Sequence, residues 1–221
     1  MAMTAPSGNA SFELLHVDNT LLVVDKPGGL LAVPGRGPDR QDCLAARVQA
    51  RYPDALIVHR LDMATSGLMV MARGPAAQRA LSKAFAAREV NKRYIAVVAG
   101  RLEAPPEGWG IIDLPIIVDW PNRPRQIVDH TMGKPSLTRW RVVAHDPPSG
   151  TTRIELEPVT GRSHQLRVHL AAMGHPILGD ALYAPPAVQA QAPRLMLHAC
   201  SLGFAHPETG AQLVFECPAP F

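Results

Sequence analysis

The segment HRLDMATSGLMVMAR, residues 59–73, brings a cation, a carboxylate and small polar residues together beside an apolar run. Arg60 and Asp62 lie two residues apart, and a Thr-Ser-Gly triplet separates them from a strand-like LMVMA. A carboxylate at the mouth of a buried strand can act as a nucleophile or a base if a second cation keeps it ionised. An Asp–Arg pair that only fixes a loop is the more common arrangement. Asp62 is therefore a candidate catalytic residue that needs a further cationic partner.

The segment GRSHQLRVHLAAMG, residues 161–174, supplies such a cation on a predicted helix at about 162–173. Thr160 or Ser163 is expected to cap this helix, and Gly174 is expected to end it. The apolar residues that recur at helical spacing and should face the core are Leu166, Leu170 and Met173.

Arg167 lies in the middle of this helix, on a flank that it shares with His164. An unpaired guanidinium beside an apolar stripe is costly, so Arg167 is expected to pair with a carboxylate. The residues Gly161-Arg162-Ser163 could also meet a phosphate at the helix N-terminus, although many helices begin in this way.

Tyr94, in the segment KRYIAVV, could stack on a nucleobase and offer a hydroxyl for proton transfer, although a tyrosine at the edge of a core is more common. Basic residues cluster around it. Between residues 73 and 93 there is one acid, Glu89, and the basic residues are Arg73, Arg79, Lys83, Arg88, Lys92 and Arg93. Two more, Arg123 and Arg125, follow Trp120. Basic runs are often solvated surfaces, but two runs that flank a candidate site favour phosphate binding.

Other chemistries lack their motifs. Ser163 with His164 or His169 does not form the G-x-S-x-G nucleophile elbow, and the two histidines lack the H-E-x-x-H spacing. No Walker A loop and no G-x-G-x-x-G is present. Three further histidines, each typical of a structural residue when taken alone, are His59, His175 and His198. We assign none of these residues to a metal.

Composition is that of an ordinary globular protein, with 47% hydrophobic and 19% charged residues and a net charge of +3. Three cysteines without a C-x-x-C pair favour a reducing cytoplasm over a disulfide framework. The N-terminus has no signal-peptide pattern, and no apolar stretch approaches the ~18–20 residues that span a bilayer. The expected localisation is the cytoplasm, with no membrane association.

Strands are predicted to outnumber helices and to follow one another, which is typical of an α+β fold with a mixed, largely antiparallel sheet flanked by helices. The Pro-rich segment 101–136 is expected to be an irregular excursion. Predicted helices cover 41–52, 75–88 and 162–173, and predicted strands cover 12–17, 20–27, 30–35, 68–72, 92–100, 137–145, 151–159, 194–204 and 211–218.

The motifs HRLD and TSGL, then KRY, GRSHQLRVHL and GHPILGD, occur in the order found in the RluA family of pseudouridine synthases, which the chain resembles from about residue 12 to 218. The early VDKPGGLLAVPG looks like the first motif of that family. The resemblance implies the pseudouridine synthase catalytic fold, with an RNA-binding cleft along the sheet. It also implies one catalytic domain, 12–221, after a flexible segment, 1–11, without the S4-type RNA-binding domain of larger members.

Carried over residue by residue, the resemblance gives Asp62 as the catalytic aspartate and Arg167 as its basic partner. Arg60 matches the arginine that enters the RNA stack, and Tyr94 matches the tyrosine that packs on the flipped uracil. Leu195 or Leu197 is expected in the wall of the base pocket. The remaining candidates for RNA binding are His59, Thr65, Ser66, Arg93, Arg123, Arg125, Arg162 and His164.

The resemblance implies that the protein isomerises uridine to pseudouridine without a metal or other cofactor. The implied partners are stem-loops of tRNA, at uridine 32 of the anticodon loop, and of 23S rRNA, at a uridine of the position 746 type; no obligate protein partner is expected. Two alternatives stay open: a non-catalytic RNA-binding protein, and a serine hydrolase that uses Ser163. The sequence does not choose between attack of Asp62 at C1′ and proton removal at C2′.

Overall fold

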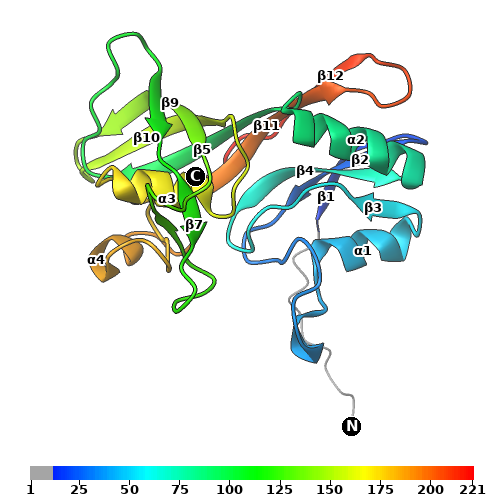
Figure 1. Cartoon of the computed structure of the whole chain (residues 1–221), viewed down its shortest axis with the longest axis horizontal. Coiled ribbons are helices and arrows are strands. Elements are labelled where there is room, and N and C mark those ends of the chain that lie inside the picture. The colour runs from blue at the N-terminus through cyan, green and yellow to red at the C-terminus, as the bar shows by residue number, and fades with distance from the viewer. Residues whose placement is uncertain (1–11) are drawn as a thin grey trace.

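A ten-stranded mixed sheet organises residues 12–221, the part of the chain that the computed structural model describes (Figure 1). The flexible segment expected at residues 1–11 lies outside the described residues. The strand order is β1-β2-β4-β11-β5-β10-β9-β6, with β3 paired to β4 and β12 paired to β11, while β7 and β8 form a separate hairpin. The strands are β1 (Glu13–Val17), β2 (Leu21–Lys26), β3 (Ala55–Ile57), β4 (Ser66–Arg73), β5 (Asn91–Ala99), β6 (Gly110–Asp113), β7 (Ile116–Val118), β8 (Gln126–Val128), β9 (Leu137–Asp146), β10 (Thr151–Pro158), β11 (Leu197–Ala205) and β12 (Gln212–Glu216).

Short helices cover both faces of this sheet. They are α1 (Leu44–Arg51), α2 (Pro75–Ala87), α3 (Gln165–Ala172) and α4 (Pro186–Gln189), together with a 3-10 turn, η1 (Pro38–Arg40). No helix among residues 12–221 is long and apolar enough to cross a membrane.

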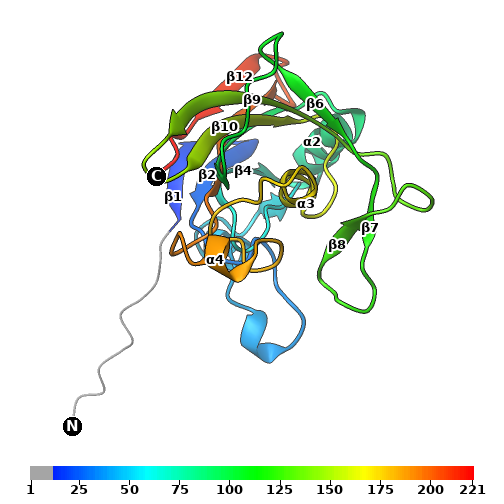
Figure 2. The same ribbon diagram turned by 90° about the vertical axis from the view of Figure 1, so that its left-hand side faces the viewer.

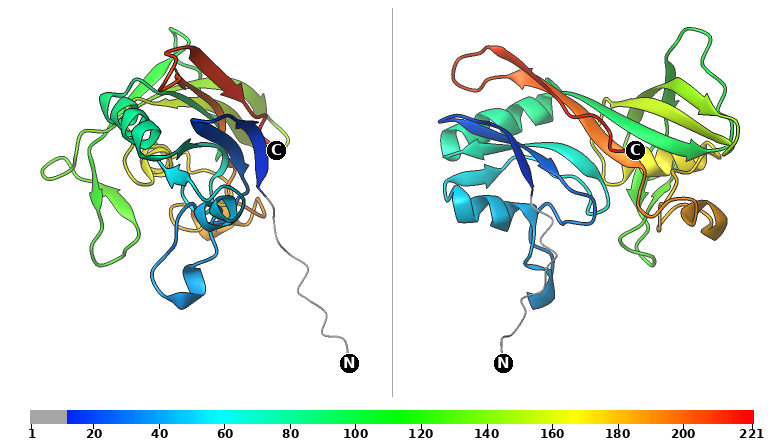
Figure 3. Two further views of the ribbon diagram at one scale, coloured as in Figure 1. Left: turned by 90° about the vertical axis from the view of Figure 1, so that its right-hand side faces the viewer. Right: turned by 180° about the vertical axis from the view of Figure 1, so that it is seen from behind.

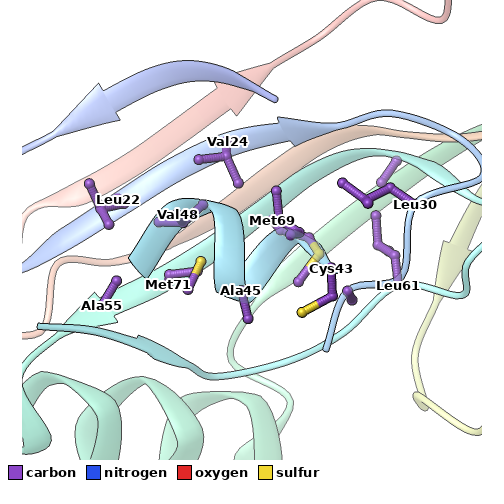
Figure 4. Close-up of a cluster of buried hydrophobic side chains, with 13 residues drawn as sticks. Leu22, Val24, Leu30, Cys43, Ala45, Val48, Ala55, Leu61, Met69 and Met71 are labelled. Carbon is purple, nitrogen blue, oxygen red and sulfur yellow. The ribbon is translucent and has the colours of Figure 1, made fainter. Parts of the chain in front are cut away.

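Strands β2 and β4 are buried on both faces because α1 and α2 pack on opposite sides of them. One core cluster joins Leu22 and Met69 to Val48 of α1 (Figure 4), and another joins Leu21 and Leu81 on the side of α2. Side chains alternate between the two faces of a strand, so a continuous apolar run such as that of β4 is what a doubly covered strand requires. The hairpin of β11 and β12 extends this second core beside α2 (Figure 3).

Helix α3 builds a third core against β5, β9 and β10 (Figure 2). Leu166 and Leu170 pack with Ile154, Leu156 and Trp140 there. All residues from Gln165 to Leu170 are buried, so this helix has no solvated flank over that stretch, and its polar residues must find partners inside the protein.

The part of the sheet formed by β1, β2, β3 and β4 meets the remaining strands where β4 and β11 pair in parallel. This pairing covers only two residue pairs, Ser66 with His198 and Gly67 with Ala199. All other pairings between the strands are antiparallel. Gly67 has a φ of +114°, and a Cβ placed there would lie 2.3 Å from the carbonyl oxygen of Ala199. Only glycine fits this crossing, which follows directly on the segment that carries Asp62.

The predicted mixed, largely antiparallel sheet and its three main helices are confirmed. The strand predicted at 30–35 is wrong, because Leu31 makes only an isolated bridge with Cys43 before Pro34 and Gly35 turn the chain. Strand β3 was not predicted, since three residues are too few to show a period. The excursion at 101–136 is not wholly irregular, since it contains β6 at the sheet edge and the β7–β8 hairpin.

Helix α3 begins at Gln165, three residues later than predicted, and its N-cap is not Thr160 or Ser163. His164 occupies that position with a left-handed φ of 55° and makes no side-chain cap. The Thr160 hydroxyl instead donates to Gln165 Oε1 at 2.8 Å, and the helix N-cap residue, His164, makes no side-chain cap bond.

Replacing Gly67 with alanine is expected to destabilise the fold by more than about 3 kcal/mol, because the new Cβ would overlap the backbone of Ala199 at the crossing of β4 and β11. Gly210→Ala is the matched control: its φ is +74°, but a Cβ there meets nothing within 4 Å, so a loss of about 1 kcal/mol is expected. Urea unfolding followed by circular dichroism measures both. Equal losses for the two variants would contradict this explanation.

Candidate active site

A cavity of about 310 Å³ opens where the segment between β3 and β4 faces β5 and the start of α3. Its lining contains Arg60, Asp62 and Thr65 from that segment, Tyr94 from β5, and Leu197 from β11. The polar side chains that the start of α3 contributes are Arg162, His164, Gln165 and Arg167. Most of the candidate residues, drawn from four separate parts of the sequence, therefore line one cavity.

Arg167 joins two carboxylates at the base of this cavity. Its Nη1 donates to Asp62 Oδ2 at 3.3 Å, while Nε and Nη2 donate to Asp180 at 2.8 and 2.6 Å. The side chains of Arg167 and Asp180 are 5% and 1% exposed, whereas that of Asp62 is 27% exposed. The expected Arg167–Asp62 pair is confirmed, and the better buried partner of Arg167 is Asp180.

The charge balance at this site explains how a buried guanidinium is tolerated. Burial by itself lowers the pKa of Arg167, but the hydrogen bonds and charge of Asp180, followed by those of Asp62, raise its pKa above the ordinary value. Both carboxylate oxygens of Asp180 accept hydrogen bonds from Arg167, so the orientation of the guanidinium is fixed and its Nη1 faces the cavity. Asp62 meets this fixed cation while remaining open to a ligand.

Asp180 was missed in the assignment of site residues, although it is the last residue of GHPILGD. No periodicity or spacing relates it to Arg167, because a loop of irregular structure separates them. Its backbone neighbours add to its role: Oδ1 accepts the N–H groups of Leu182 and Tyr183, at 2.9 and 3.2 Å. These bonds fix the loop that carries Tyr183.

Tyr183 connects the hairpin of β7 and β8 to the cavity. Its hydroxyl accepts the Gln126 N–H at 2.9 Å and shares a hydrogen bond of 2.6 Å with His164 Nδ1. The other ring nitrogen of His164, Nε2, lies 3.8 Å from Asp62 Oδ2. Burial lowers the pKa of His164, with Asp62 opposing the shift, so the ring faces Asp62 as a neutral imidazole.

Tyr94 lies beside Asp62 and packs between two of the core clusters. Burial, followed by the negative charge of Asp62, raises the pKa of its phenol far above the ordinary value. The hydroxyl is therefore protonated at neutral pH. Its ring forms an apolar wall of the cavity together with Leu197.

His59 is a structural residue of the cavity wall. Its Nε2 accepts the backbone N–H of Val70 at 3.1 Å, and its ring stacks on Phe85 with the centroids 4.4 Å apart. Burial, followed by the charge of Lys92, lowers its pKa to about 3. The ring is neutral and already bonded, which argues against the predicted direct role in RNA binding.

Three other predicted residues do not line the cavity. Ser66 is 3% exposed and its hydroxyl is bonded to His198 and Arg194, so it is buried away from any RNA. Leu195 is 2% exposed in the core beneath α3, so of the two candidate leucines only Leu197 lines the cavity, beside Leu61 and Leu166. Arg93 lies outside this cavity, paired with Glu157.

The β7–β8 hairpin holds the remaining two predicted RNA-binding residues at and beside its turn. Arg123 is exposed and lies over the ring of Trp120, 4.2 Å from its centroid. Arg125 lies over Tyr183 at 5.6 Å, and so contacts the chain of hydrogen bonds that leads to His164.

Lys26 is a buried cation of this region that the sequence patterns did not single out. It is fully buried at the end of β2, and its ammonium group donates to the carbonyl oxygens of Pro27, Leu30 and Met63, at 2.9, 2.8 and 3.1 Å. Burial lowers its pKa to about 8, while the charge of Asp62 opposes the shift. Since Met63 follows Asp62 directly, Lys26 fixes the backbone of the segment that carries the aspartate.

One group of metal-ligating side chains occurs among residues 12–221, formed by Asp25, His198 and Cys217. Both ring nitrogens of His198 are already bonded, to Ser66 at 2.8 Å and to the carbonyl oxygen of Cys217 at 3.1 Å. A metal would have to displace one of these bonds, and none of the three residues lines the cavity. We assign no metal to this group.

The chain is similar to known proteins both in sequence and in three-dimensional structure. The sequence profile described as RNA pseudouridylate synthase matches residues 20–172. The chain is 52% identical over 208 residues to a dual-specificity RNA pseudouridine synthase RluA of Yersinia pestis, covering 94% of this chain and 99% of that protein. It is 50% identical to the protein of the same name in Escherichia coli K12, over 94% and 93% of the two chains. In three dimensions it resembles human RNA pseudouridylate synthase domain containing 1, with a TM-score of 0.78 and 28% identity, covering 99% of this chain and 87% of that one.

Replacing Asp180 with asparagine is expected to destabilise the protein by about 3 kcal/mol, because it leaves the buried Arg167 with only one anionic partner. Asp54→Asn makes the same change in a more exposed aspartate–arginine pair, with Arg73, and is expected to cost less than about 1 kcal/mol. Urea titrations of both variants provide the comparison. Similar losses in the free energy of unfolding would show that the buried Arg167–Asp180 pair contributes no more to stability than the exposed pair.

The pH dependence of stability should reflect the depressed pKa of His59. Between its ordinary pKa of 6.5 and its folded value of about 3, the unfolded chain binds a proton that the folded protein does not. Stability is therefore lost as the pH falls from 7 toward 5. In His59→Gln, whose side-chain oxygen can still accept the Val70 N–H, the free energy of unfolding should fall less over this range. His130→Gln, at an exposed histidine, is the control, and a slope equal to wild type in His59→Gln would refute the assignment.

Proposed function

Because the chain belongs to the RNA pseudouridine synthase family, we propose that Asp62 is the residue that performs the isomerisation and that Arg167, Arg60 and Tyr94 assist it. The enzyme is an isomerase that converts uridine in RNA to pseudouridine. The observation that carries the proposal for Asp62 is its position: a partly exposed carboxylate that meets a buried, fixed guanidinium inside the cavity.

We propose structured tRNA and 23S rRNA as the substrates, with uridine 32 of an anticodon loop and a uridine of a 23S rRNA hairpin as the targets. Support comes from the relatives described as dual-specificity enzymes, which match almost the whole chain at about half identity. Residues 12–221 would act as one catalytic domain, supported by the single large sheet. A cytoplasmic site of action is consistent with Cys43, Cys200 and Cys217 all being free.

The reaction breaks the bond between N1 of uracil and C1′ of the ribose, rotates the base, and joins C5 to C1′. Asp62 would act at the sugar, either by attack at C1′ or by removal of a proton at C2′, and both routes require the carboxylate to be ionised. Arg167 donates to Oδ2 and so fixes the carboxylate in position inside the cavity. Nε2 of His164 lies 3.8 Å from the same oxygen. Because burial lowers the pKa of His164, its ring is neutral and adds no second positive charge beside Asp62.

A target uridine is stacked in its loop and must be extruded to reach Asp62, at a cost of a few kcal/mol. Arg60 is exposed at the mouth of the cavity, where it can fill the space that the base leaves. Tyr94 and Leu197 line the interior and offer a flat aromatic face and an apolar wall to the extruded base. Together these contacts would offset the loss of stacking in the RNA.

The protonated state of Tyr94 limits its part in removing the C5 proton. Because burial and the charge of Asp62 raise the pKa of the Tyr94 phenol, it is not ionised at neutral pH and cannot act as a base in its phenolate form. It could pass a proton only by accepting one while it gives up its own. Stacking on the base is therefore the main role that we propose for Tyr94.

The hydrolase alternative has little support, because Ser163 is exposed and forms no hydrogen bond with a histidine among residues 12–221. The alternative of a non-catalytic RNA-binding protein predicts that Asp62 is dispensable.

The test is release of tritium from C5 of labelled uridine in a tRNA anticodon stem-loop and in a 23S rRNA hairpin. Wild type is expected to release tritium from both RNAs, and Asp62→Asn is expected to be slower by about 10³-fold or more. Asp39→Asn, an exposed aspartate outside the cavity, is the matched control and should retain wild-type rates. Full activity of Asp62→Asn would overturn the assignment of the aspartate, and release from one RNA alone would reject dual specificity.

A further inference from the structure

A second cavity, of about 520 Å³, adjoins the candidate active site. Lys92 and Pro158 line both cavities and so form the rim between them. The second cavity, which we call the basic groove, lies where the ladder between β5 and β10 ends at Tyr94 and Leu156. Its lining also includes Ser201 and Gly203 of β11 with Val214 and Glu216 of β12.

Four cations and two acids line the basic groove. The cations are Arg88, Lys92, Arg93 and Arg139, and the acids are Glu157 and Glu216. Glu157 accepts from Arg93 Nε at 3.0 Å and from Arg139 Nη1 at 2.8 Å. Both arginines remain about half exposed, at 50% and 44%, so Glu157 orients them without consuming their remaining N–H donors.

The other two cations have no acidic partner among residues 12–221. Arg88 is exposed at the C-terminal end of α2, with a left-handed φ of 62°. Burial, followed by the positive charge of Arg88, lowers the pKa of Lys92. An anion bound between Lys92 and Arg88 would relieve the repulsion between these two cations.

The basic surface continues beyond the groove along β9. Arg139 and Arg141 both lie over the ring of Trp109, 4.8 and 4.9 Å from its centroid. Arg141 also pairs with Glu155, which in turn lies 3.5 Å from Arg93. Ion pairs and ring contacts thus fix the guanidinium groups of Arg93, Arg139 and Arg141 in a row across strands of the sheet, beginning next to Lys92 of the shared rim.

We propose that the basic groove binds the phosphate backbone of the RNA strand that leads away from the target uridine. The inference rests on the proposed function, because it requires a uridine in the adjoining cavity. Lys92 at the shared rim would meet a phosphate next to the extruded nucleotide, and Arg88, Arg93 and Arg139 would meet those that follow. A chain of repeated phosphates fits a row of separate cations that is continuous with the catalytic cavity, whereas a single small anion would use only one part of it.

The test compares two double variants that remove the same number of positive charges. Arg88→Asn with Arg139→Gln changes the groove, and asparagine is chosen at position 88 because it tolerates the left-handed backbone. Arg51→Gln with Arg101→Gln is the matched control, since both residues are exposed and lie outside the groove and outside the two predicted basic runs. All proteins carry Asp62→Asn so that bound RNA is not converted, and circular dichroism confirms that each is folded.

Affinity is measured by fluorescence anisotropy, over a range of salt concentrations, for a full anticodon stem-loop and for a short oligonucleotide centred on the target uridine. The groove substitutions are expected to weaken binding of both RNAs. The fold-loss of affinity for the stem-loop should be about ten times the fold-loss for the oligonucleotide. The slope of the groove variant's log affinity against log salt concentration should become shallower by about 1 for each phosphate that the variant no longer neutralises. The control with Arg51→Gln and Arg101→Gln should change neither quantity by more than about twofold.

Equal losses on the two RNAs, or a loss in the control as large as in the groove variant, would overturn the proposed path. Failure of the proposed function is a separate result, because it would appear as absent tritium release from the otherwise unmodified enzyme. The binding measurements do not depend on catalysis and would still report on the groove.

Discussion

Burial of the Arg167 guanidinium is the constraint on which the site depends. A cation that is nearly closed off from water must be matched by anions at short range, and Asp180 supplies most of that match from inside the protein. Asp62 completes it from the cavity side, at the longer distance of 3.3 Å. The division is useful for chemistry, because the well-buried carboxylate holds the cation while the exposed carboxylate remains free to react.

The backbone around Asp62 is fixed from two sides. Lys26 binds the carbonyl oxygen of Met63 from the end of β2, and Gly67 permits the close crossing of β4 and β11 directly after the segment. Neither residue reacts with RNA in the proposed mechanism. Both restrict the movement of a segment that would otherwise be an exposed loop, and restricted geometry is what a carboxylate needs in order to meet a sugar in a productive position.

The β7–β8 hairpin is linked to the same site through Tyr183. This tyrosine bonds to the backbone of Gln126 and to His164, and the guanidinium groups of Arg125 and Arg167 lie 5.6 and 5.1 Å from the centroid of its ring. A hairpin with exposed Trp120 and Arg123 is therefore connected to Asp62, the proposed catalytic residue, through a short, specific set of contacts. The predicted RNA-binding residues of the hairpin lie outside the cavity, yet they belong to the same structural unit.

The sequence by itself determined the family, the mixed sheet, the main helices and the need of Arg167 for a carboxylate. These follow from features that are local along the chain: periodicity, helix length, and motifs such as HRLD and KRY. Short elements such as β3 and the late start of α3 escaped prediction because pairing with β4 and the left-handed His164 determine them.

Only the tertiary structure decided which partners each charged or polar side chain has. Asp180 and Tyr183 gained their places at the site because a loop after α3 brings them back to Arg167 and His164. Ser66 was expected to bind RNA, and Leu195 was expected in the wall of the base pocket. Both are instead buried, since the pairing of β4 with β11 and the packing beneath α3 enclose them. Burial and long-range pairing depend on contacts between residues that are distant in sequence, and no local pattern records them.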